Sequence, residues 1–242
     1  MIGSVLITGA SSGIGREISI KLSELGYNCI LVGRRLKELE NTLTLMTGNN
    51  HLIQNGDLND HLFVNELSNS SENLVGIVHS AGILKLLPYK FVNKLDFEEI
   101  INTNLFAPFF LTQALLKNKK LLNNSSILFI SSISGPIIGS KGNLMYSASK
   151  SAINGIVKVL ALELAIKKIR VNAISAGMIY TEMWKGDSNV ISSEQLIQDS
   201  LKYPLGYGQP IDVANLTSFL ISPESKWITG STIVLDGGFT IQ

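Results

Sequence analysis

Three side chains in the middle of the chain are suited to proton transfer at a carbonyl group. Tyr146 and Lys150 lie one helical turn apart, so their side chains are expected on one helix face. A free phenol has a pKa of about 10, and an adjacent cation favours its ionised form, which makes Tyr146 a usable acid and base. Ser132 can donate a hydrogen bond to a carbonyl oxygen that gains charge during hydride transfer. Taken separately, these residues could be a turn serine and a half-buried aromatic.

A glycine-rich segment, Thr8–Gly15, follows a short apolar run and opens a helical pattern. Glycines let the backbone turn tightly and approach a pyrophosphate, and a helix N-terminus offers unpaired N–H groups to the phosphates. A simple strand-to-helix turn is the alternative, but the strand, the spacing and the helix together favour dinucleotide binding.

Two arginines, Arg34 and Arg35, follow the second apolar run, where a dehydrogenase that prefers NAD carries an acidic residue. A guanidinium can bind the 2′-phosphate that a carboxylate would repel. The sequence therefore predicts NADP(H), although both arginines could simply begin a solvated helix. Asp57 is placed to accept a hydrogen bond from the adenine amino group, but Asp is also common in turns.

Short runs rich in Val, Ile and Leu alternate with segments of helical periodicity, which predicts βαβ units and a parallel sheet. We predict one domain over residues 1–242, a doubly wound α/β Rossmann fold with seven parallel strands and helices on both faces. The predicted strands are Val5–Thr8, Cys29–Val32, His51–Gln54, Leu74–His79, Ser126–Ser131, Val171–Ser175 and Thr232–Leu235. The predicted helices lie near Gly13–Leu25, Leu36–Met46, Asn59–Leu67, Phe97–Asn118, Tyr146–Lys167 and Ile211–Ile221.

The stretch 177–208 interrupts this alternation with polar turn residues, one predicted helix near Ser193–Leu201, and large side chains such as Tyr203 and Tyr207. A long insertion after the carboxyl end of a strand lies where open α/β sheets place their ligand crevice. We predict a substrate lid; an ordinary excursion packed on the body is the alternative.

The composition limits the partners. Lys plus Arg number 20 against 19 Asp plus Glu, which leaves no basic field for nucleic acid or an anionic membrane. Cys29 is the only cysteine, so we expect no disulfide within the chain and no Cys-rich zinc site, and we predict no metal and a cytoplasmic location. The longest nearly apolar stretch, Leu105–Leu116, is too short to span a bilayer.

In combination, Thr8–Gly15, Asn104, Ser132 and Tyr146–Lys150 resemble the short-chain dehydrogenase/reductase family, and the match runs over essentially the whole chain. The resemblance implies that Tyr146 protonates the carbonyl while Ser132 steadies its oxygen. It implies that Lys150 lowers the pKa of Tyr146 and binds the nicotinamide ribose, and that Asn104 holds a water that links Lys150 to solvent. The cofactor-binding residues expected from the motifs and the resemblance are Gly9, Ser11, Ser12, Gly13, Ile14, Gly15, Arg34, Arg35, Asp57, Ala81, Gly82, Tyr146, Lys150, Ile179 and Thr181.

Three departures from the family pattern concern the site. His79 and Ser80 stand where the family has two asparagines, and its place in a strand favours a structural role for His79 over acid–base chemistry. Ala176 replaces the usual proline before Gly177, which loosens φ before the lid. The spacing from Ser132 to Tyr146 is one residue longer than the commonest, and the segment 135–139 could absorb the extra residue in a loop.

Two segments, Leu105–Leu116 and Ser151–Ala165, are apolar nearly all round, which predicts burial against the sheet and a second subunit. Family members commonly form tetramers through these helices, so a homotetramer is expected. The ending from Trp227 to Gly238 resembles bacterial members that reduce 3-oxoacyl groups on acyl carrier protein. The lysines Lys119, Lys120, Lys167 and Lys168 could dock such a carrier, although solvated lysines are usual at helix ends.

The leading hypothesis is an NADPH-dependent carbonyl reductase similar to 3-oxoacyl-acyl-carrier-protein reductases. One alternative is a reductase or dehydrogenase of a sugar, a polyol or another small secondary alcohol, since the family applies one catalytic set to many substrates. An alternative from another class is a non-catalytic regulator that senses NADP(H).

Overall fold

A computed structural model describes residues 2–181 and 198–241 of the chain, and it confirms the predicted α/β alternation. The strands are β1 (Ser4–Thr8), β2 (Asn28–Gly33), β3 (Leu52–Asn55), β4 (Leu74–His79), β5 (Leu121–Ser132), β6 (Arg170–Ala176) and β7 (Thr232–Leu235). The helices are α1 (Gly13–Glu24), α2 (Leu36–Thr44), α3 (His61–Ser70), α4 (Lys94–Ile101), α5 (Ala107–Lys117), α6 (Leu144–Leu164) and α9 (Pro210–Ile221). Most predicted boundaries differ from these by one to three residues, but β5 begins five residues earlier than predicted.

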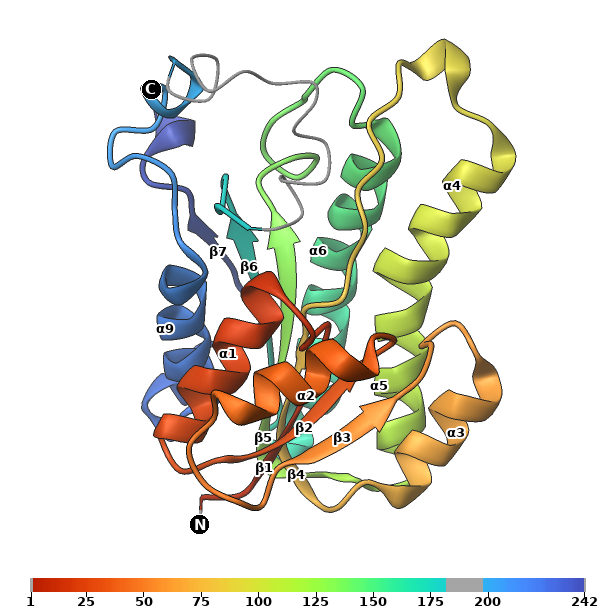
Figure 1. Cartoon of the computed structure of the whole chain (residues 1–242), viewed down its shortest axis with the longest axis vertical. Coiled ribbons are helices and arrows are strands. Elements are labelled where there is room, and N and C mark those ends of the chain that lie inside the picture. The colour runs from red at the N-terminus through yellow and green to blue at the C-terminus, as the bar shows by residue number, and fades with distance from the viewer. Residues whose placement is uncertain (1, 182–197, 242) are drawn as a thin grey trace.

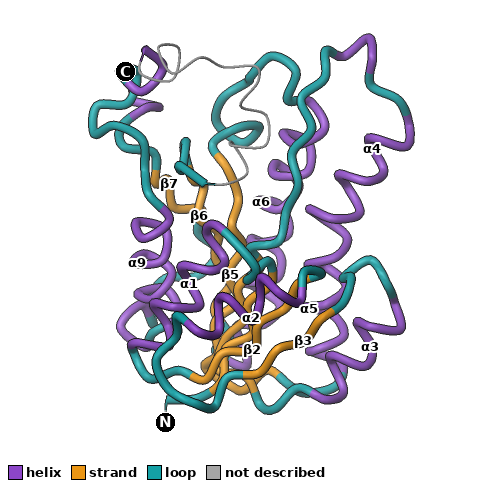
Figure 2. Tube along the Cα trace, in the orientation of Figure 1, coloured by secondary structure: helices purple, strands orange, loops and turns teal. Residues whose placement is uncertain are grey.

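The strands form one parallel sheet in the order β3-β2-β1-β4-β5-β6-β7 (Figures 1 and 2). The chain builds outward from β1 in one direction, then crosses to β4 and builds in the other. Such a reversal of strand order opens a crevice at the carboxyl ends of the two central strands, because the loops that follow them diverge to opposite faces.

Helices cover both faces of the sheet, each over its own apolar core. On one face Ile18 of α1, Leu39 of α2 and Val213 of α9 are fully buried against the sheet. On the other face Leu111 of α5 and Val157 of α6 are equally buried, together with residues of α3. The strands between them are nearly continuous Val, Ile and Leu, as a sheet buried on both faces requires.

The prediction of a single helix over Phe97–Asn118 is wrong in one respect, because the structure divides this segment into three elements. Helix α4 ends at Ile101, a π-helical turn covers Asn102–Phe106, and α5 continues from Ala107. Pro108 has no N–H to donate to the preceding turn, so regular α-helical hydrogen bonding cannot run through this region. The wider turn contains the buried Asn104.

The predicted lid falls only partly within the described residues. At its base Tyr180 N donates to Gly208 O (2.9 Å) and Gly208 N donates to Met178 O (3.0 Å), so the two ends of the stretch meet. Residues 182–197, which include most of the helix predicted near Ser193–Leu201, lie outside the description. Among the helices that are described, none combines the length and apolar character needed to cross a bilayer.

The C-terminal end of α9 is closed by a buried cation from β6. The Arg170 guanidinium donates to the carbonyl oxygens of Leu220 (2.7 Å), Ile221 (3.3 Å) and Ser222 (3.1 Å) and to Ser225 Oγ (2.7 Å). These carbonyls have no partner within the helix, and a positive charge also opposes the negative end of the helix dipole.

We predict that Arg170→Leu lowers the free energy of unfolding by about 2–4 kcal/mol, because it removes four hydrogen bonds of a buried cation at the end of α9. Denaturant unfolding at one fixed protein concentration measures this change. The exposed Lys226 lies close by in the chain and supplies the control Lys226→Leu, which should stay within about 0.5 kcal/mol of wild type. Equal unfolding energies for the two variants would contradict the proposed capping.

Candidate active site

A cleft of about 1590 Å³ opens along the carboxyl ends of the strands. Its wall combines the loop between β1 and α1, the ends of β2, β4, β5 and β6, and the start of α6. Every residue expected to bind the cofactor lies on this wall: Gly9, Ser11, Ser12, Gly13, Ile14, Gly15, Arg34, Arg35, Asp57, Ala81, Gly82, Tyr146, Lys150, Ile179 and Thr181. The fold therefore brings these residues to one space, and their contact with a cofactor stays a prediction.

The glycine-rich loop passes so close to the end of β4 that side chains are excluded. A Cβ on Gly9, whose φ is +69°, would lie 2.8 Å from the backbone nitrogen of Ala81. A Cβ on Gly15 would overlap the carbonyl oxygen of Gly9. Thr8 Oγ1 accepts hydrogen bonds from the N–H groups of Ser80 and Ala81, both at 3.1 Å, and fixes this approach. The sequence placed Thr8 in the motif without giving it this role.

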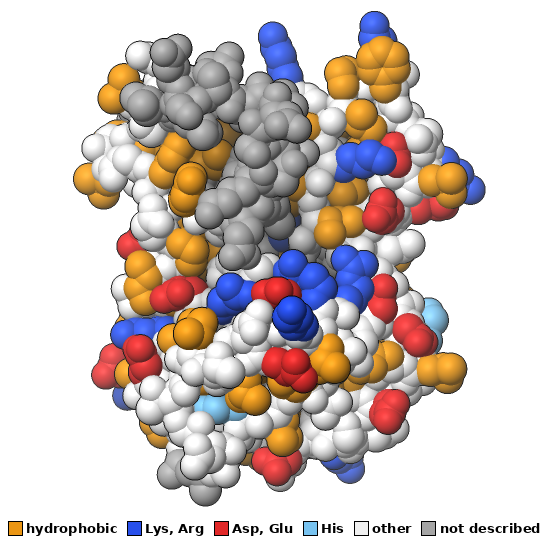
Figure 3. Space-filling model, viewed as in Figure 1, with side chains coloured by type: hydrophobic (Ala, Val, Ile, Leu, Met, Phe, Trp, Pro, Cys, Tyr) orange, Lys and Arg blue, Asp and Glu red, His pale blue; other side chains and the backbone are white. Residues whose placement is uncertain are grey.

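The N-terminus of α1 offers donors that its own N-cap residue does not use. Ser12 makes no side-chain capping bond to the helix. Its hydroxyl instead accepts from Arg35 (2.7 Å), and Ser11 Oγ also accepts from Arg35 (3.0 Å). A guanidinium, two hydroxyls and free helix N–H groups form a site that fits the phosphates of a dinucleotide. Figure 3 shows Lys and Arg side chains gathered across the middle of this face of the molecule.

Arg34 and Asp57, predicted to bind different parts of the cofactor, face each other. The Arg34 guanidinium lies 3.8 Å from the Asp57 carboxylate, and both side chains are substantially exposed. An exposed ion pair at this distance contributes little to stability, so either group can exchange its partner for a ligand.

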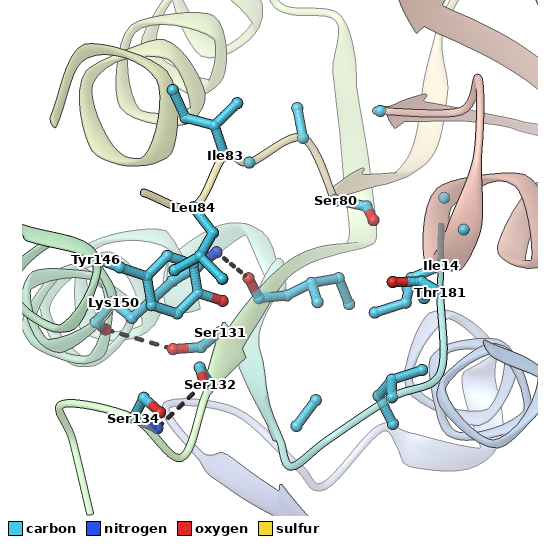
Figure 4. Close-up of a pocket in the computed structure, with 18 of the residues that line it drawn as sticks. Ile14, Ser80, Ile83, Leu84, Ser131, Ser132, Ser134, Tyr146, Lys150 and Thr181 are labelled. Carbon is cyan, nitrogen blue, oxygen red and sulfur yellow. Dashed lines mark hydrogen bonds between the residues drawn. The ribbon is translucent and has the colours of Figure 1, made fainter. Parts of the chain in front are cut away.

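Tyr146 and Lys150 project from the first turns of α6 beside the end of β5, as the shared helix face predicts. The Lys150 Nζ donates to the carbonyl oxygen of Ile130 (2.7 Å) and lies 5.5 Å from the centre of the Tyr146 ring. Figure 4 shows the Tyr146 hydroxyl pointing into the space between these residues and the opposite wall, where Ile14 and Thr181 lie.

Burial governs the titration of both groups. Desolvation lowers the pKa of Lys150 to about 8, because burial disfavours the charged ammonium. Desolvation also raises the pKa of Tyr146, and a hydrogen bond with Ser132 opposes that rise. The phenol therefore carries its proton at neutral pH, which is the form that a proton donor needs. The lowering of the Tyr146 pKa that the sequence attributed to Lys150 stays a prediction.

Ser132 reaches Tyr146 despite the extra residue between them. The intervening loop is closed by hydrogen bonds from Gly135 N to Ile138 O (2.8 Å) and from Ile138 N to Ile133 O (3.0 Å). The chain thus uses the additional residue in a tight turn. Within that turn Ser134 N donates to Ser132 Oγ (3.1 Å), which orients the hydroxyl (Figure 4).

Asn104 lies behind the wall of the cleft rather than on it. Its side-chain amide exchanges two hydrogen bonds with the backbone of Ile83, at 2.8 and 2.9 Å, and donates to Ser149 Oγ (3.2 Å). A Cβ built on Gly82 would lie 3.4 Å from Asn104 Oδ1 and 3.6 Å from Lys150 Nζ, so the three residues meet. The π-helical turn therefore delivers the amide to the rear of the catalytic group.

His79 has the surroundings of a structural residue. Its ring stacks on Phe129 at 4.8 Å, and its Nε2 lies 2.8 Å from Thr112 Oγ1. Burial lowers the pKa of His79 to about 3, so the imidazole is neutral at physiological pH. It does not line the cleft, which agrees with the structural role that the sequence favoured.

Phe239, Asp199 and Lys202 also line the cleft, and the sequence did not single them out. For Phe239 a signal existed, because it follows Gly237 and Gly238 directly after β7. A residue beyond the carboxyl end of a strand belongs to the ligand edge of such a sheet. Among the described residues, no group of three or more His, Cys, Asp or Glu side chains is arranged to bind a metal ion.

A Rossmann fold with a Ser, Tyr and Lys set beside a dinucleotide cradle defines an oxidoreductase that acts on CH–OH and C=O groups. The family model described as enoyl-(acyl carrier protein) reductase matches residues 9–240. The chain belongs to the short-chain dehydrogenase/reductase family.

Two curated relatives span nearly the whole chain. The 3-oxoacyl-acyl-carrier-protein reductase of Rickettsia bellii is 36% identical over 97% of this chain and 95% of its own length. Carbonyl reductase family member 4 of Danio rerio is 32% identical, with 98% and 97% covered. Among solved structures, a putative 2-deoxy-D-gluconate 3-dehydrogenase of Agrobacterium tumefaciens with bound NADP is 28% identical, with 99% and 96% covered and a TM-score of 0.88.

We predict that Gly9→Ala weakens NADPH binding at least tenfold and lowers the melting temperature, because the added methyl group meets the Ala81 backbone at a left-handed φ. Fluorescence titration with NADPH and thermal unfolding measure the two effects. Gly139→Ala is the matched control, since a Cβ there meets nothing within 4 Å. Unchanged NADPH affinity in Gly9→Ala would show that the close approach is not needed for binding.

Proposed function

We propose that the protein is an NADPH-dependent reductase of 3-oxoacyl thioesters, as the name of its bacterial relative suggests. The observation that carries this proposal is the convergence of Ser132, Tyr146 and Lys150 at one end of the cleft that holds the dinucleotide motif. The protonated phenol favours reduction of a ketone over other uses of the same residues.

The proposed mechanism assigns each group a position around the substrate carbonyl. Bound NADPH would supply the hydride to the carbonyl carbon. Ser132 donates a hydrogen bond to the carbonyl oxygen and Tyr146 transfers its proton to that oxygen as negative charge develops, which gives a secondary alcohol. Lys150, anchored on the Ile130 carbonyl, binds the nicotinamide ribose, and Asn104 holds the water through which the proton is replaced.

The preference for NADPH rests on the arginines at the end of β2. Arg35 is already held by two serine hydroxyls at the start of α1, and Arg34 lies beside it without a buried partner. The 2′-phosphate would complete this cluster with charge-assisted hydrogen bonds. The structure of the Agrobacterium relative with bound NADP supports the same choice.

That same relative keeps a second function open, the oxidation or reduction of a sugar or another small secondary alcohol. Its name refers to 2-deoxy-D-gluconate, and it superposes on 99% of the chain. Comparison of rates on a 3-oxoacyl thioester, a free ketone and a keto-sugar distinguishes the two functions.

We further propose a cytoplasmic homotetramer. Apolar side chains that the sheet does not cover stand on and beside α5 and α6, and they include Phe106, Phe109, Phe110, Val159, Leu162 and Ile166. A second copy of the chain would remove them from water.

Acyl carrier protein is a proposed partner, with one geometric condition. Lys119 and Lys120 precede β5, and Lys167 and Lys168 precede β6, so all four lie at the amino edge of the sheet. The cleft lies at the opposite edge. A carrier docked on these lysines could therefore deliver its substrate only to the cleft of another subunit.

We predict that Tyr146→Phe lowers kcat for NADPH-dependent ketone reduction about 10²–10⁴-fold, because it removes the proton donor and leaves the ring in place. Stopped-flow oxidation of NADPH with 3-oxobutanoyl thioester measures the rate. NADPH affinity should stay within about threefold, which separates chemistry from binding. Binding of NADPH by the wild type without turnover of any ketone or alcohol would instead favour the alternative of a non-catalytic regulator that senses NADP(H).

We predict that Arg34→Asp lowers kcat/KM for NADPH about 10–100-fold and leaves kcat/KM for NADH within about threefold, because a carboxylate repels the 2′-phosphate. Steady-state kinetics with both cofactors measure the ratio. Lys37→Asp makes the same charge change on the exposed face of α2, outside the cleft, and should leave the ratio unchanged. Equal losses of kcat/KM for NADPH in Arg34→Asp and Lys37→Asp would show that the added negative charge acts generally and that Arg34 does not bind the 2′-phosphate.

A further inference from the structure

The last turn of the chain, η5 (Phe239–Ile241), forms part of the cleft wall through Phe239. In Figure 1 this turn lies near the C-terminus, at the same end of the molecule as the loops that follow the strands. Sequence reasoning gave these residues no role. The place of β7 in the sheet indicates whether this turn faces the nucleotide or the substrate.

Strand pairing places the turn on the substrate side of the site. Ser132 at the end of β5 pairs with Ala176 of β6, and Ala176 pairs with Leu235 of β7. Neighbouring strands are about 4.8 Å apart, so Leu235 lies roughly 10 Å from Ser132 across the sheet. The dinucleotide loop begins at β1, on the opposite side of β5. The expected cofactor-binding residues Ile179 and Thr181 follow β6, so the nucleotide should reach no further than that strand. A group that extends beyond it toward β7 therefore belongs to the substrate.

One ring contact and three hydrogen bonds hold Phe239 in place. Its ring stacks on Tyr203 with 4.5 Å between centroids and 24° between planes. The Asp236 carboxylate accepts hydrogen bonds from Gly238 N (3.0 Å), Thr240 N (2.8 Å) and Thr240 Oγ1 (2.7 Å), which closes the turn on both sides of Phe239. The Phe239 ring is therefore already held in one position when a ligand binds.

The aromatic side chains give this wall an apolar part, next to the ion pair of Asp199 and Lys202. Tyr203 is hydrogen-bonded to the backbone of Met178, and the Tyr207 hydroxyl donates to Asp199 (2.8 Å). Each tyrosine hydroxyl therefore has one partner within the protein, and Phe239 has no polar group. The ring carbons of Tyr203 and Phe239 favour contact with an alkyl chain.

We infer that Phe239, stacked on Tyr203, binds the acyl chain of the substrate and sets the preference for chain length. Tyr203 and Asp236 act as positioning residues for this surface. The inference rests on the proposed reduction of 3-oxoacyl thioesters and names the group that distinguishes one such substrate from another.

The test compares 3-oxobutanoyl and 3-oxodecanoyl N-acetylcysteamine thioesters with wild type and Phe239→Ala. The variant should lose about 10–100-fold in kcat/KM for the longer substrate, mainly through KM, and less than about threefold for the shorter one. The Kd for NADPH should not change. Ile241→Ala, two residues further along the same turn and 87% exposed, is the matched control and should resemble wild type.

Three further variants distinguish the effect of the rings from the effect of the Tyr203 hydroxyl and from a general loss of stability. Tyr203→Phe keeps the stacked surface and should keep the preference for the longer chain, whereas Tyr203→Ala should lose it. Phe239→Leu should restore most of the activity on the longer substrate, because it returns apolar surface to the same position. Equal losses on both thioesters, or a weaker NADPH affinity in Phe239→Ala, would overturn the inference.

Failure of the proposed function would be seen separately. If the wild type reduces neither thioester but reduces simple ketones, the same variants are compared on 2-butanone and 2-decanone. A loss confined to the longer ketone would support the role of Phe239 without the thioester. A loss independent of length, or no reduction of either class, would overturn it.

Discussion

The close approach of two backbones, at Gly9 and Ala81, is the constraint on which the rest of the site depends. β1 and β4 are neighbours in the sheet although the intervening chain forms β2 and β3. Their loops leave in opposite directions, and only the absence of a side chain at Gly9 lets them start so close together. The crevice that results has one wall suited to phosphates and another that continues toward the catalytic residues.

The end of the cleft that contains Tyr146 and Lys150 depends on a second principle, the burial of groups that titrate. Lys150 is anchored by a carbonyl of β5, and that anchor places its ammonium beside the Tyr146 ring. Burial opposes charge on both side chains, so it moves their pKa values apart, with that of Tyr146 raised and that of Lys150 lowered to about 8. The resting pair is therefore a protonated phenol and a weakly basic amine, which is the arrangement suited to giving a proton away.

Much of this arrangement could be predicted from the sequence because it is local. Strand and helix patterns have fixed periods, and the spacing of Tyr146 and Lys150 alone fixes their shared face. Pro108 marks the break in the helix, but the contacts of Asn104 could not be predicted, because they join it to Ile83, which is distant in sequence. The dominance of desolvation over the Ser132 hydrogen bond in the pKa of Tyr146 likewise requires knowing which elements cover the phenol.

The two halves of the cleft differ in how the chain encodes them. The nucleotide half comes from one short motif and the ends of adjacent strands, so its residue types follow from phosphate chemistry. The substrate half is assembled from the segment that leads into α9 and from the turn after β7, joined by Tyr203 and Phe239. The position of Phe239 after Gly237 and Gly238 gives a signal in the sequence, but its stacking on Tyr203 does not. Stacking between them creates a surface that changes with either partner, whereas a side chain at Gly9 would meet the backbone of Ala81. The half built on ring contacts therefore tolerates substitution, and the half built on backbone contact does not.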